Sequence, residues 1–308
     1  MKICFMGSMD FAVEILNGLN DKYGVDLVVT QPDKPFGRKQ KLKGTPVKER
    51  AIELGLEVFQ PSSIKNDYKK IIEEEFDFII VAAYGQIIPE IVLNHGKYRA
   101  INVHASLLPK YRGGSPMHRA IINGDKYSGV TIMYMVKKMD AGLILAQEKV
   151  KISFSDNVKT LEKKLAKTGK VLLLKTIDDL LDDKIEAKQQ NQEEISFAYN
   201  LKPEEKEINF CDKAIDIYNK IRGMYPWPIA EIKVNNKKIK IFKAEYSEEN
   251  TNKTPGTIYK INKSGVFIQC LEGTIILKEI QLQGKKRMDI NAFMNGIGKQ
   301  FFKLDKNI

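Results

Sequence analysis

The sequence is poor in the residues that build covalent or metal-held frameworks. Its 308 residues include three cysteines, and Cys4, Cys211 and Cys270 lie far apart without any CxxC spacing. This pattern indicates neither a disulfide framework nor a zinc site, and it fits a reducing compartment. The three histidines share no ligand spacing either. We therefore expect no bound metal and a cytoplasmic location.

Long apolar runs are also missing. No stretch approaches the roughly 18 to 20 apolar residues of a membrane-spanning helix. The N-terminus, MKICFMGSMDF, lacks the apolar run and the cleavage pattern of a signal peptide. Hydrophobic residues make up 43% and charged residues 29%, which excludes collagen-like and disordered chains and leaves room for two globular domains. We expect no membrane partner and no obligate protein partner.

The first two thirds of the chain alternate short apolar runs with helical periodicity. Strands are predicted at 2–6, 26–30, 56–59, 76–83, 100–104 and 129–135, and helices at 10–19, 46–55 and 156–181. This alternation predicts an α/β domain with an open, mostly parallel, Rossmann-like sheet whose sites lie at the carboxyl ends of its strands. The turn FMGSMDF has one glycine where a dinucleotide fingerprint needs three, which disfavours a nicotinamide oxidoreductase.

The pattern changes near residue 185. Residues 185–206 are polar without sustained periodicity, which predicts a linker lying over a surface. A helix at about 212–222 and five short strands follow, and these predict a smaller β-barrel of the oligonucleotide-binding (OB) type. We therefore expect an α/β domain over 1–184, a linker over 185–206 and an OB-like domain over 207–308.

Positive charge is concentrated in two segments. The net charge is +11, and residues 207–308 carry 18 Lys and Arg against 11 Asp and Glu. Residues 31–50 hold seven basic side chains against two acidic ones, and Pro32, Pro35 and Gly37 predict that the first half of this segment is a non-helical loop after a strand. A solvated surface or a compositional bias of the source genome would also give a positive total. The uneven distribution favours a nucleic-acid partner.

Residues that carry chemistry are concentrated in NVHASLLPKYRGG at 102–114. Side chains alternate along a strand with period two, so Asn102 and His104 face the same space. A carboxamide can donate to a developing oxyanion, and an imidazole can exchange protons near neutral pH. By itself the pair could equally well end a strand without any catalytic role.

The longer motif INVHASLLPKYRGGSP resembles the signature of the folate-dependent formyltransferases. The resemblance runs through FMGSMDFA, QPDKPFGR, VFQP, VAAYGQIIP, GVTIMYM, MDAGLIL and YPWP, so it spans nearly the whole chain. This set is similar to the bacterial methionyl-tRNA formyltransferase family. The resemblance implies transfer of a formyl group from 10-formyltetrahydrofolate to the free amino group of methionine on charged initiator tRNA, for translation initiation.

The resemblance also implies roles for individual residues. The family uses an Asn, a His and an Asp, which match Asn102, His104 and Asp140. We infer from the chemistry that Asn102 and His104 donate to the oxyanion, and that Asp140 orients His104 and helps to relay a proton through water. The folate-contacting segment matches Ser106, Leu107, Leu108 and Pro109, and the wall of the pterin pocket matches Ala83, Tyr84, Gly85, Gln86 and Ile87. Arg38 matches the arginine of the loop that enters the tRNA acceptor arm, and Lys34, Lys39, Lys41 and Lys43 would add phosphate affinity.

Three other functions remain open at this point. A sugar-nucleotide or glycinamide-ribotide formyltransferase could carry the same motif. A glycinamide enzyme would lack the basic second domain, and a sugar-nucleotide enzyme is not expected to keep the QPDKPFGR loop. A non-catalytic RNA-binding protein on the same scaffold is the third reading, and the presence of Asn102, His104 and Asp140 argues against it.

Overall fold

The computed structural model describes residues 1–37 and 40–308, which form two compact units. The first unit comprises residues 1–116, 127–151 and 162–199, and the second comprises 117–126, 152–161 and 200–308. Two residues of the predicted tRNA-binding loop, Arg38 and Lys39, lie outside the described residues. In the described part of the chain, no helix has the length and apolar character needed to cross a membrane.

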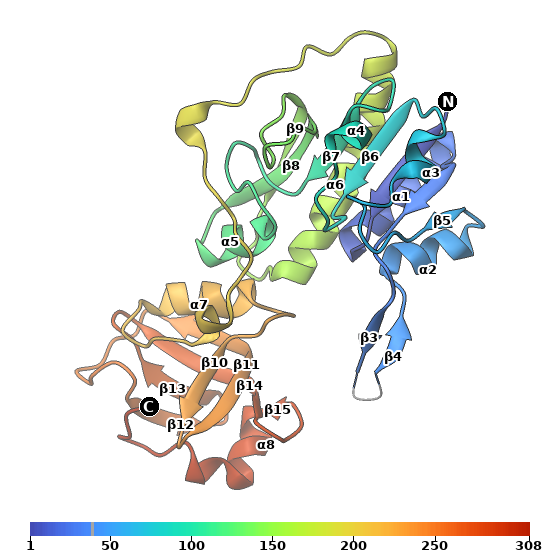
Figure 1. The fold of residues 1–308 in the computed structure, drawn as a ribbon. Coiled ribbons are helices and arrows are strands. Elements are labelled where there is room, and N and C mark those ends of the chain that lie inside the picture. Colours follow the sequence, from blue (N-terminus) through green and yellow to red (C-terminus); the bar gives the residue numbers. More distant parts are fainter. Residues whose placement is uncertain (38–39) are drawn as a thin grey trace. The chain divides into compact units, whose positions relative to one another are not determined.

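The first unit is built on a seven-stranded sheet with the order β5-β2-β1-β6-β7-β8-β9 (Figure 1). Five neighbouring strands are parallel: β1 (Ile3–Gly7), β2 (Leu27–Val29), β5 (Val58–Phe59), β6 (Phe78–Ala82) and β7 (Ala100–His104). The antiparallel strands β8 (Tyr127–Tyr134) and β9 (Ile144–Lys151) complete the sheet. The predicted mostly parallel α/β sheet is confirmed. β9 was not predicted, because its exposed and half-buried residues form no apolar run.

Helices cover both faces of this sheet. The elements are α1 (Asp10–Tyr23), α2 (Pro46–Glu53), α3 (Lys69–Ile72), α4 (Glu90–Leu93) and α6 (Val158–Leu181), of which α6 begins in the second unit. Gly169 of α6 packs against Val103 of β7, whereas Ala100 of β7 belongs to a core cluster with residues of α3 and α4. Asn102 and His104 are in phase with Ala100, and so they lie on the opposite face from α6.

Residues 34–43, predicted as a loop, form a short hairpin of β3 (Lys34–Phe36) and β4 (Lys41–Lys43). The chain reverses through Gly37 and Gln40, whose φ angles of +70° and +47° lie in the left-handed region. Proline has no amide hydrogen to donate. Pro35 is compatible with a two-stranded ribbon because both strands are edge strands, whose outward-facing amide groups pair with no other strand. The hydrophobic periodicity of the sequence does not indicate this hairpin, because its strands are short and rich in lysine and one of them contains proline.

The predicted linker is divided between the two units after Tyr199. Lys188 exchanges two backbone hydrogen bonds of 2.8 Å with Ile144, where β9 begins. Further on, Arg112 and Phe197 form an isolated parallel bridge, and a short 3-10 turn, Gln192–Glu194, lies between these contacts. Residues 185–199 therefore pair with strands and loops of the first unit along much of their length.

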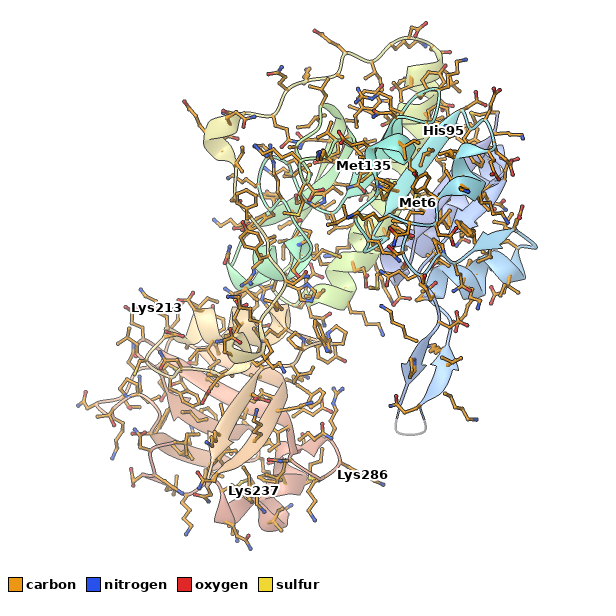
Figure 2. The ribbon with its side chains drawn as sticks, in the orientation of Figure 1. Met6, His95, Met135, Lys213, Lys237 and Lys286 are labelled. Carbon is orange, nitrogen blue, oxygen red and sulfur yellow. The ribbon has the colours of Figure 1, made fainter. Side chains whose placement is uncertain are left out.

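The second unit is an antiparallel β domain, as predicted. Its strands are β10 (Glu231–Val234), β11 (Lys237–Ser247), β12 (Ile258–Asn262), β13 (Gly265–Gln269), β14 (Thr274–Leu282) and β15 (Met288–Asp289). They pair in the order β10-β11-β14-β13-β12, and β15 adds to β14. The helices are α7 (Ala214–Gly223) and α8 (Ile290–Asn295), with 3-10 turns at Pro203–Lys206 and Ile297–Gln300. Figure 2 shows Lys213, Lys237 and Lys286 extending from this unit.

Two segments from the predicted α/β domain belong to the second unit. Residues 117–126, which contain most of α5 (Pro116–Ile122), and residues 152–161 fall within the stretch assigned by sequence to the α/β domain. Ile122 packs against the core of the second unit, and Arg119 forms an ion pair with Glu205. The main-chain oxygen of Asp156 accepts a hydrogen bond of 2.9 Å from the guanidinium group of Arg222 in α7. These contacts join residues far apart in sequence, and no local pattern marks them.

Candidate active site

Asn102 and His104 lie together at the carboxyl end of β7. They are 9% and 7% exposed, and they point to the same side because they are two residues apart on one strand. Asn102 lies opposite Val81 on β6 and Met133 on β8, so the pair is held in the middle of the sheet. Among the residues that the structure describes, none is hydrogen-bonded to the Asn102 carboxamide. Both amide hydrogens are therefore available to a ligand.

His104 is hydrogen-bonded through one ring nitrogen and faces an acidic side chain with the other. Nε2 lies 3.0 Å from the main-chain oxygen of Tyr111, and Nδ1 lies 3.8 Å from Oδ2 of Asp140. A carbonyl oxygen can only accept, so Nε2 carries the proton and donates it to Tyr111. The 3.8 Å separation is too long for a direct hydrogen bond. Nδ1 is therefore the ring atom that faces the Asp140 carboxylate.

Asp140 is held in an unusual backbone conformation. Its φ angle of +47° lies in the left-handed region, which costs a non-glycine residue roughly 1–2 kcal/mol. The amide of Gly113 donates to its Oδ2 at 2.8 Å, and its own main-chain oxygen accepts from the Gln190 side chain at 2.8 Å. These two hydrogen bonds fix the carboxylate and the backbone at once, so the position of Asp140 is determined by residues distant in sequence.

Gln190 and Arg112 form the support of this turn, and sequence reasoning gave a role to neither of them. Arg112 is 1% exposed, and its Nε and Nη2 donate to the Gln190 side-chain oxygen at 3.1 and 2.7 Å. The Gln190 side-chain nitrogen donates to the main-chain oxygens of Asp140 and Gly142 at 2.8 and 2.9 Å. Burial lowers the pKa of Arg112, and the nearby charge of Asp140 opposes that shift.

The sequence offered unequal signals for these two residues. Arg112 lies inside the motif at 102–114, directly before two glycines, and its charge at that position could have marked it. Nothing distinguishes Gln190 from its neighbours Gln189 and Gln192, because all three are glutamines in a polar segment. Only the structure shows that Gln190 is buried while Gln189 is exposed.

The predicted folate-contacting residues 106–109 are mostly internal. Ser106 is 1% exposed, and its hydroxyl donates to the main-chain oxygen of Lys110 at 2.7 Å. Thr131 of β8 donates to the Ser106 carbonyl at 2.7 Å and accepts from the Leu108 amide at 3.1 Å. Leu108 and Pro109 are buried, whereas Leu107 is half-buried and packs beside Gly129. The segment is therefore fastened to β8, and Leu107 is its most accessible member.

The predicted pterin wall, residues 83–87, alternates between buried and exposed positions. Ala83, Gly85 and Ile87 are exposed, and Ile87 is 91% accessible. Tyr84 is 2% exposed, burial raises its pKa to about 12, and its carbonyl accepts hydrogen bonds from Ser8 at 2.9 Å and Gln31 at 2.8 Å. Gly85 has a φ of +86°, and a Cβ there would lie 2.4 Å from the Gln31 amide nitrogen.

This segment follows β6, which is the parallel neighbour of β7, so it begins at the same edge of the sheet as Asn102 and His104. The Gln86 side chain accepts a hydrogen bond of 2.9 Å from the Ile64 amide. The alternation along 83–87 therefore exposes small and apolar groups at this edge of the sheet. Hydrogen bonds of Ser8, Gln31 and Gln86 hold the segment in position.

The described lysines of the predicted tRNA-binding set lie on the β3–β4 hairpin. Lys34 is directly opposite Lys43, and Phe36 is opposite Lys41. Period-two alternation places Lys34, Lys41 and Lys43 on one face of the ribbon. Lys34 also donates to the Gln31 side chain at 2.8 Å, and all three lysines are exposed. The structure thus groups three of the five predicted residues, and Arg38 and Lys39 belong to the part that it does not describe.

Two family models match successive parts of the chain. Residues 1–177 match the family model described as formyl transferase, and residues 200–298 match that of the formyl transferase C-terminal domain. The methionyl-tRNA formyltransferase of Macrococcus caseolyticus is 45% identical over 301 residues, which cover 97% of this chain and 96% of the relative. This chain belongs to the methionyl-tRNA formyltransferase family. The family member of Listeria innocua is 45% identical over 305 residues, covering 98% and 97% of the two chains.

More distant solved structures share the fold. An N-formyltransferase from Helicobacter canadensis, in complex with folinic acid and dTDP-3-aminofucose, has a TM-score of 0.69 at 21% identity, covering 90% of this chain and 98% of that one. HypX from Aquifex aeolicus, in complex with tetrahydrofolic acid, has a TM-score of 0.65 at 17% identity, and the match covers 99% of this chain and 48% of HypX. Within the described residues, no three His, Cys, Asp or Glu side chains gather as metal ligands.

Proposed function

We propose that this protein transfers the formyl group of 10-formyltetrahydrofolate to the amino group of methionine on charged initiator tRNA, in the cytoplasm. The observation that carries the proposal is the unpartnered Asn102 carboxamide beside His104 and Asp140 at the carboxyl end of β7. Membership of the methionyl-tRNA formyltransferase family supports the acceptor. The folate compounds named for the solved N-formyltransferase and HypX support a folate donor.

Asn102 is the proposed oxyanion donor. When the methionyl amine attacks the formyl carbon, a carbon–nitrogen bond forms and the formyl oxygen gains negative charge. A fixed, neutral donor stabilises this charge without having to reorganise, and removing one such donor costs roughly 3–4 kcal/mol of barrier. The Asn102 amide hydrogens suit this role because no described residue occupies them.

His104 and Asp140 are the proposed proton-transfer pair. The attacking amine must lose a proton, and N10 of the folate must gain one as its bond to the formyl carbon breaks. Since Nε2 of His104 donates to Tyr111, its exchangeable site is Nδ1, which faces Oδ2 of Asp140 at 3.8 Å. We propose that a water in contact with this pair carries the proton. We therefore propose that Asn102 is the main oxyanion donor and that His104 mainly transfers the proton, which narrows the expectation that both residues donate to the oxyanion.

The donor is proposed to bind along the exposed edge of residues 83–87. Ala83, Gly85 and Ile87 offer small and apolar surface to a flat heterocycle, and their backbone groups can give it hydrogen bonds. Leu107 is the accessible member of residues 106–109 and would add apolar contact. The buried Ser106, Leu108 and Pro109 would act by holding Leu107 in place.

The β3–β4 hairpin is proposed to bind tRNA phosphates. Like charges directly opposite each other, as in the Lys34 and Lys43 pair, destabilise a two-stranded ribbon. Binding of a polyanion neutralises both charges and so removes the repulsion between them. The surplus of 18 basic over 11 acidic residues in 207–308 supports a second contact with the same molecule. We retain residues 1–184 as the catalytic part, 185–206 as the connection and 207–308 as the tRNA-binding part.

Incubation of the purified protein with 10-formyltetrahydrofolate and methionyl initiator tRNA tests the proposal. The expected product is formylmethionyl-tRNA, with little product from charged elongator tRNA. A parallel reaction offers dTDP-3-aminofucose, the compound named for the solved N-formyltransferase. Formylation of the sugar alone would replace the proposed acceptor, and tRNA binding without any product would indicate a non-catalytic RNA-binding protein. Arg38→Ala should weaken use of the charged tRNA while leaving folate binding intact.

A further inference from the structure

Two large aromatic side chains lie exposed on the segment that follows α6. Phe197 is 47% exposed and Tyr199 is 61% exposed. Their rings stack on one another with centroids 5.4 Å apart and planes inclined by 4°. Neither the family motifs nor the proposed catalytic groups include them. An exposed, parallel pair of rings is unusual on a surface where apolar side chains normally occur singly.

The backbone between the two rings is firmly held. Ala198 is fully buried, its amide donates to the Arg112 carbonyl at 2.7 Å, and its carbonyl accepts from the Ser115 amide at 2.9 Å. The Ser196 hydroxyl accepts from the Tyr111 amide at 3.0 Å. Residues 196 and 198 therefore face the loop at 111–115, and period-two alternation directs both aromatic rings outward.

The loop that holds this segment is also the loop that holds the proposed active site. The Tyr111 carbonyl accepts from His104 Nε2, and the Gly113 amide donates to Asp140 Oδ2. Phe197 is the residue after Ser196, whose hydroxyl binds the amide of Tyr111. The aromatic pair is thus connected to His104 through a short chain of hydrogen bonds and covalent bonds, all within the first unit.

We propose that Phe197 and Tyr199 form a stacking platform for the unpaired bases at the 3′ end of the charged tRNA. This inference rests on the proposed function, because methionine is esterified to the ribose of the last nucleotide. When its amine lies at Asn102, the last bases must cross the surface around the catalytic loop. Aromatic rings stack on any base, and the exposed Lys110, next to Tyr111, supplies positive charge for a linking phosphate.

Steady-state formylation with ring-deletion variants tests the platform. Phe197→Ala and Tyr199→Ala should each raise KM for charged tRNA by roughly 5- to 100-fold and leave KM for the formyl donor unchanged. Phe197→Trp and Tyr199→Phe should keep a low KM because they keep a ring. Phe197→Leu, which retains apolar area without a ring, should behave like alanine. Tyr127→Ala removes another exposed aromatic residue of the first unit, 45% accessible, and is the matched control.

A binding experiment separates stacking from catalysis. Initiator tRNA with 2-aminopurine in place of its terminal adenine should lose fluorescence on binding to the wild-type protein, because stacking quenches this base. The double variant of Phe197→Ala and Tyr199→Ala should bind without quenching, with unchanged thermal unfolding. Wild-type quenching and wild-type KM in the double variant would overturn the platform. Quenching by a wild-type protein that makes no formylmethionyl-tRNA would support the platform and overturn the proposed function instead.

Discussion

Two features that follow strands of the same parallel sheet differ in how firmly they are held. The groups at and after β7 are buried and tied by hydrogen bonds to other segments: His104 donates to the Tyr111 carbonyl, and Asp140 accepts from the Gly113 amide and the Gln190 side chain. The ribbon that follows β2 is an exposed hairpin with lysines opposed across its strands. Bond-making chemistry requires fixed geometry, whereas attraction to phosphates tolerates loose geometry.

The largest effect is expected at the buried site. Asn102→Ala should lower kcat by roughly 100- to 1000-fold, because the oxyanion loses its fixed donor. KM for the formyl donor and for charged tRNA should change little, since the lost interaction forms only in the transition state. Steady-state kinetics measure both constants, with the exposed Asn66→Ala as control. An unchanged kcat would mean that another group holds the oxyanion.

A smaller loss is expected from the support of Asp140. Gln190→Ala leaves the Arg112 guanidinium and two main-chain oxygens without their partner, which should cost about 1–3 kcal/mol of unfolding free energy and reduce kcat about tenfold. Gln190→Glu can still accept from Arg112 but cannot donate to Asp140. We expect it to recover stability without recovering kcat.

Urea unfolding and the pH dependence of kcat distinguish these two variants, and the exposed Gln189→Ala is the matched control. A positioning role requires that the pH profile change together with kcat. If Gln190→Ala loses stability while kcat and its pH profile stay at the wild-type values, Gln190 acts on folding alone.

Substitutions in the exposed ribbon should have a smaller effect, and they should change tRNA affinity instead of kcat. Lys41→Ala should weaken tRNA binding a few-fold and reduce the slope of log affinity against log salt by about one, because one phosphate contact is lost. The kcat should not change. Binding titrations between low and high salt measure the slope, and Lys167→Ala, at an exposed position of α6, is the control. Equal slopes in the variant and the wild type would remove Lys41 from the tRNA contact.

The smallest effect is expected at the base of the ribbon. Asp33 accepts hydrogen bonds from the Gln60 amide at 2.9 Å and from the Lys48 ammonium at 2.7 Å, and both lower its pKa. A carboxyl group whose folded pKa is depressed stabilises the fold above its unfolded pKa, and loses that contribution as the pH falls through the folded value. Asp33→Asn should therefore be less stable than the wild type near neutral pH.

That difference should shrink as the pH falls below about 4, where the unfolded carboxyl group takes up its proton. Urea unfolding of the two proteins between pH 6 and the acid range measures it. A stability difference that stays constant down to the lowest pH would show that the Asp33 charge does not anchor the ribbon.

Much of the scaffold and part of the site were predictable from the sequence. Apolar runs marked β1 and β6, because strands covered on both faces carry mostly apolar residues. The hairpin of β3 and β4 was missed because each strand has three residues, one contains proline, and Lys34, Leu42 and the other described side chains of the two strands are exposed. The burial of Gln190 was missed because its partners come from loops around Arg112 and Asp140.

The sequence by itself determined that Asn102 and His104 share one face of one strand, because the direction of a side chain along a strand follows from local covalent geometry. It also determined the family, through motifs spread along the chain. Only the tertiary structure decided which nitrogen of His104 faces Asp140, which glutamine supports that turn, and where Phe197 and Tyr199 lie. Those facts depend on hydrogen bonds between segments that meet only after the sheet has formed.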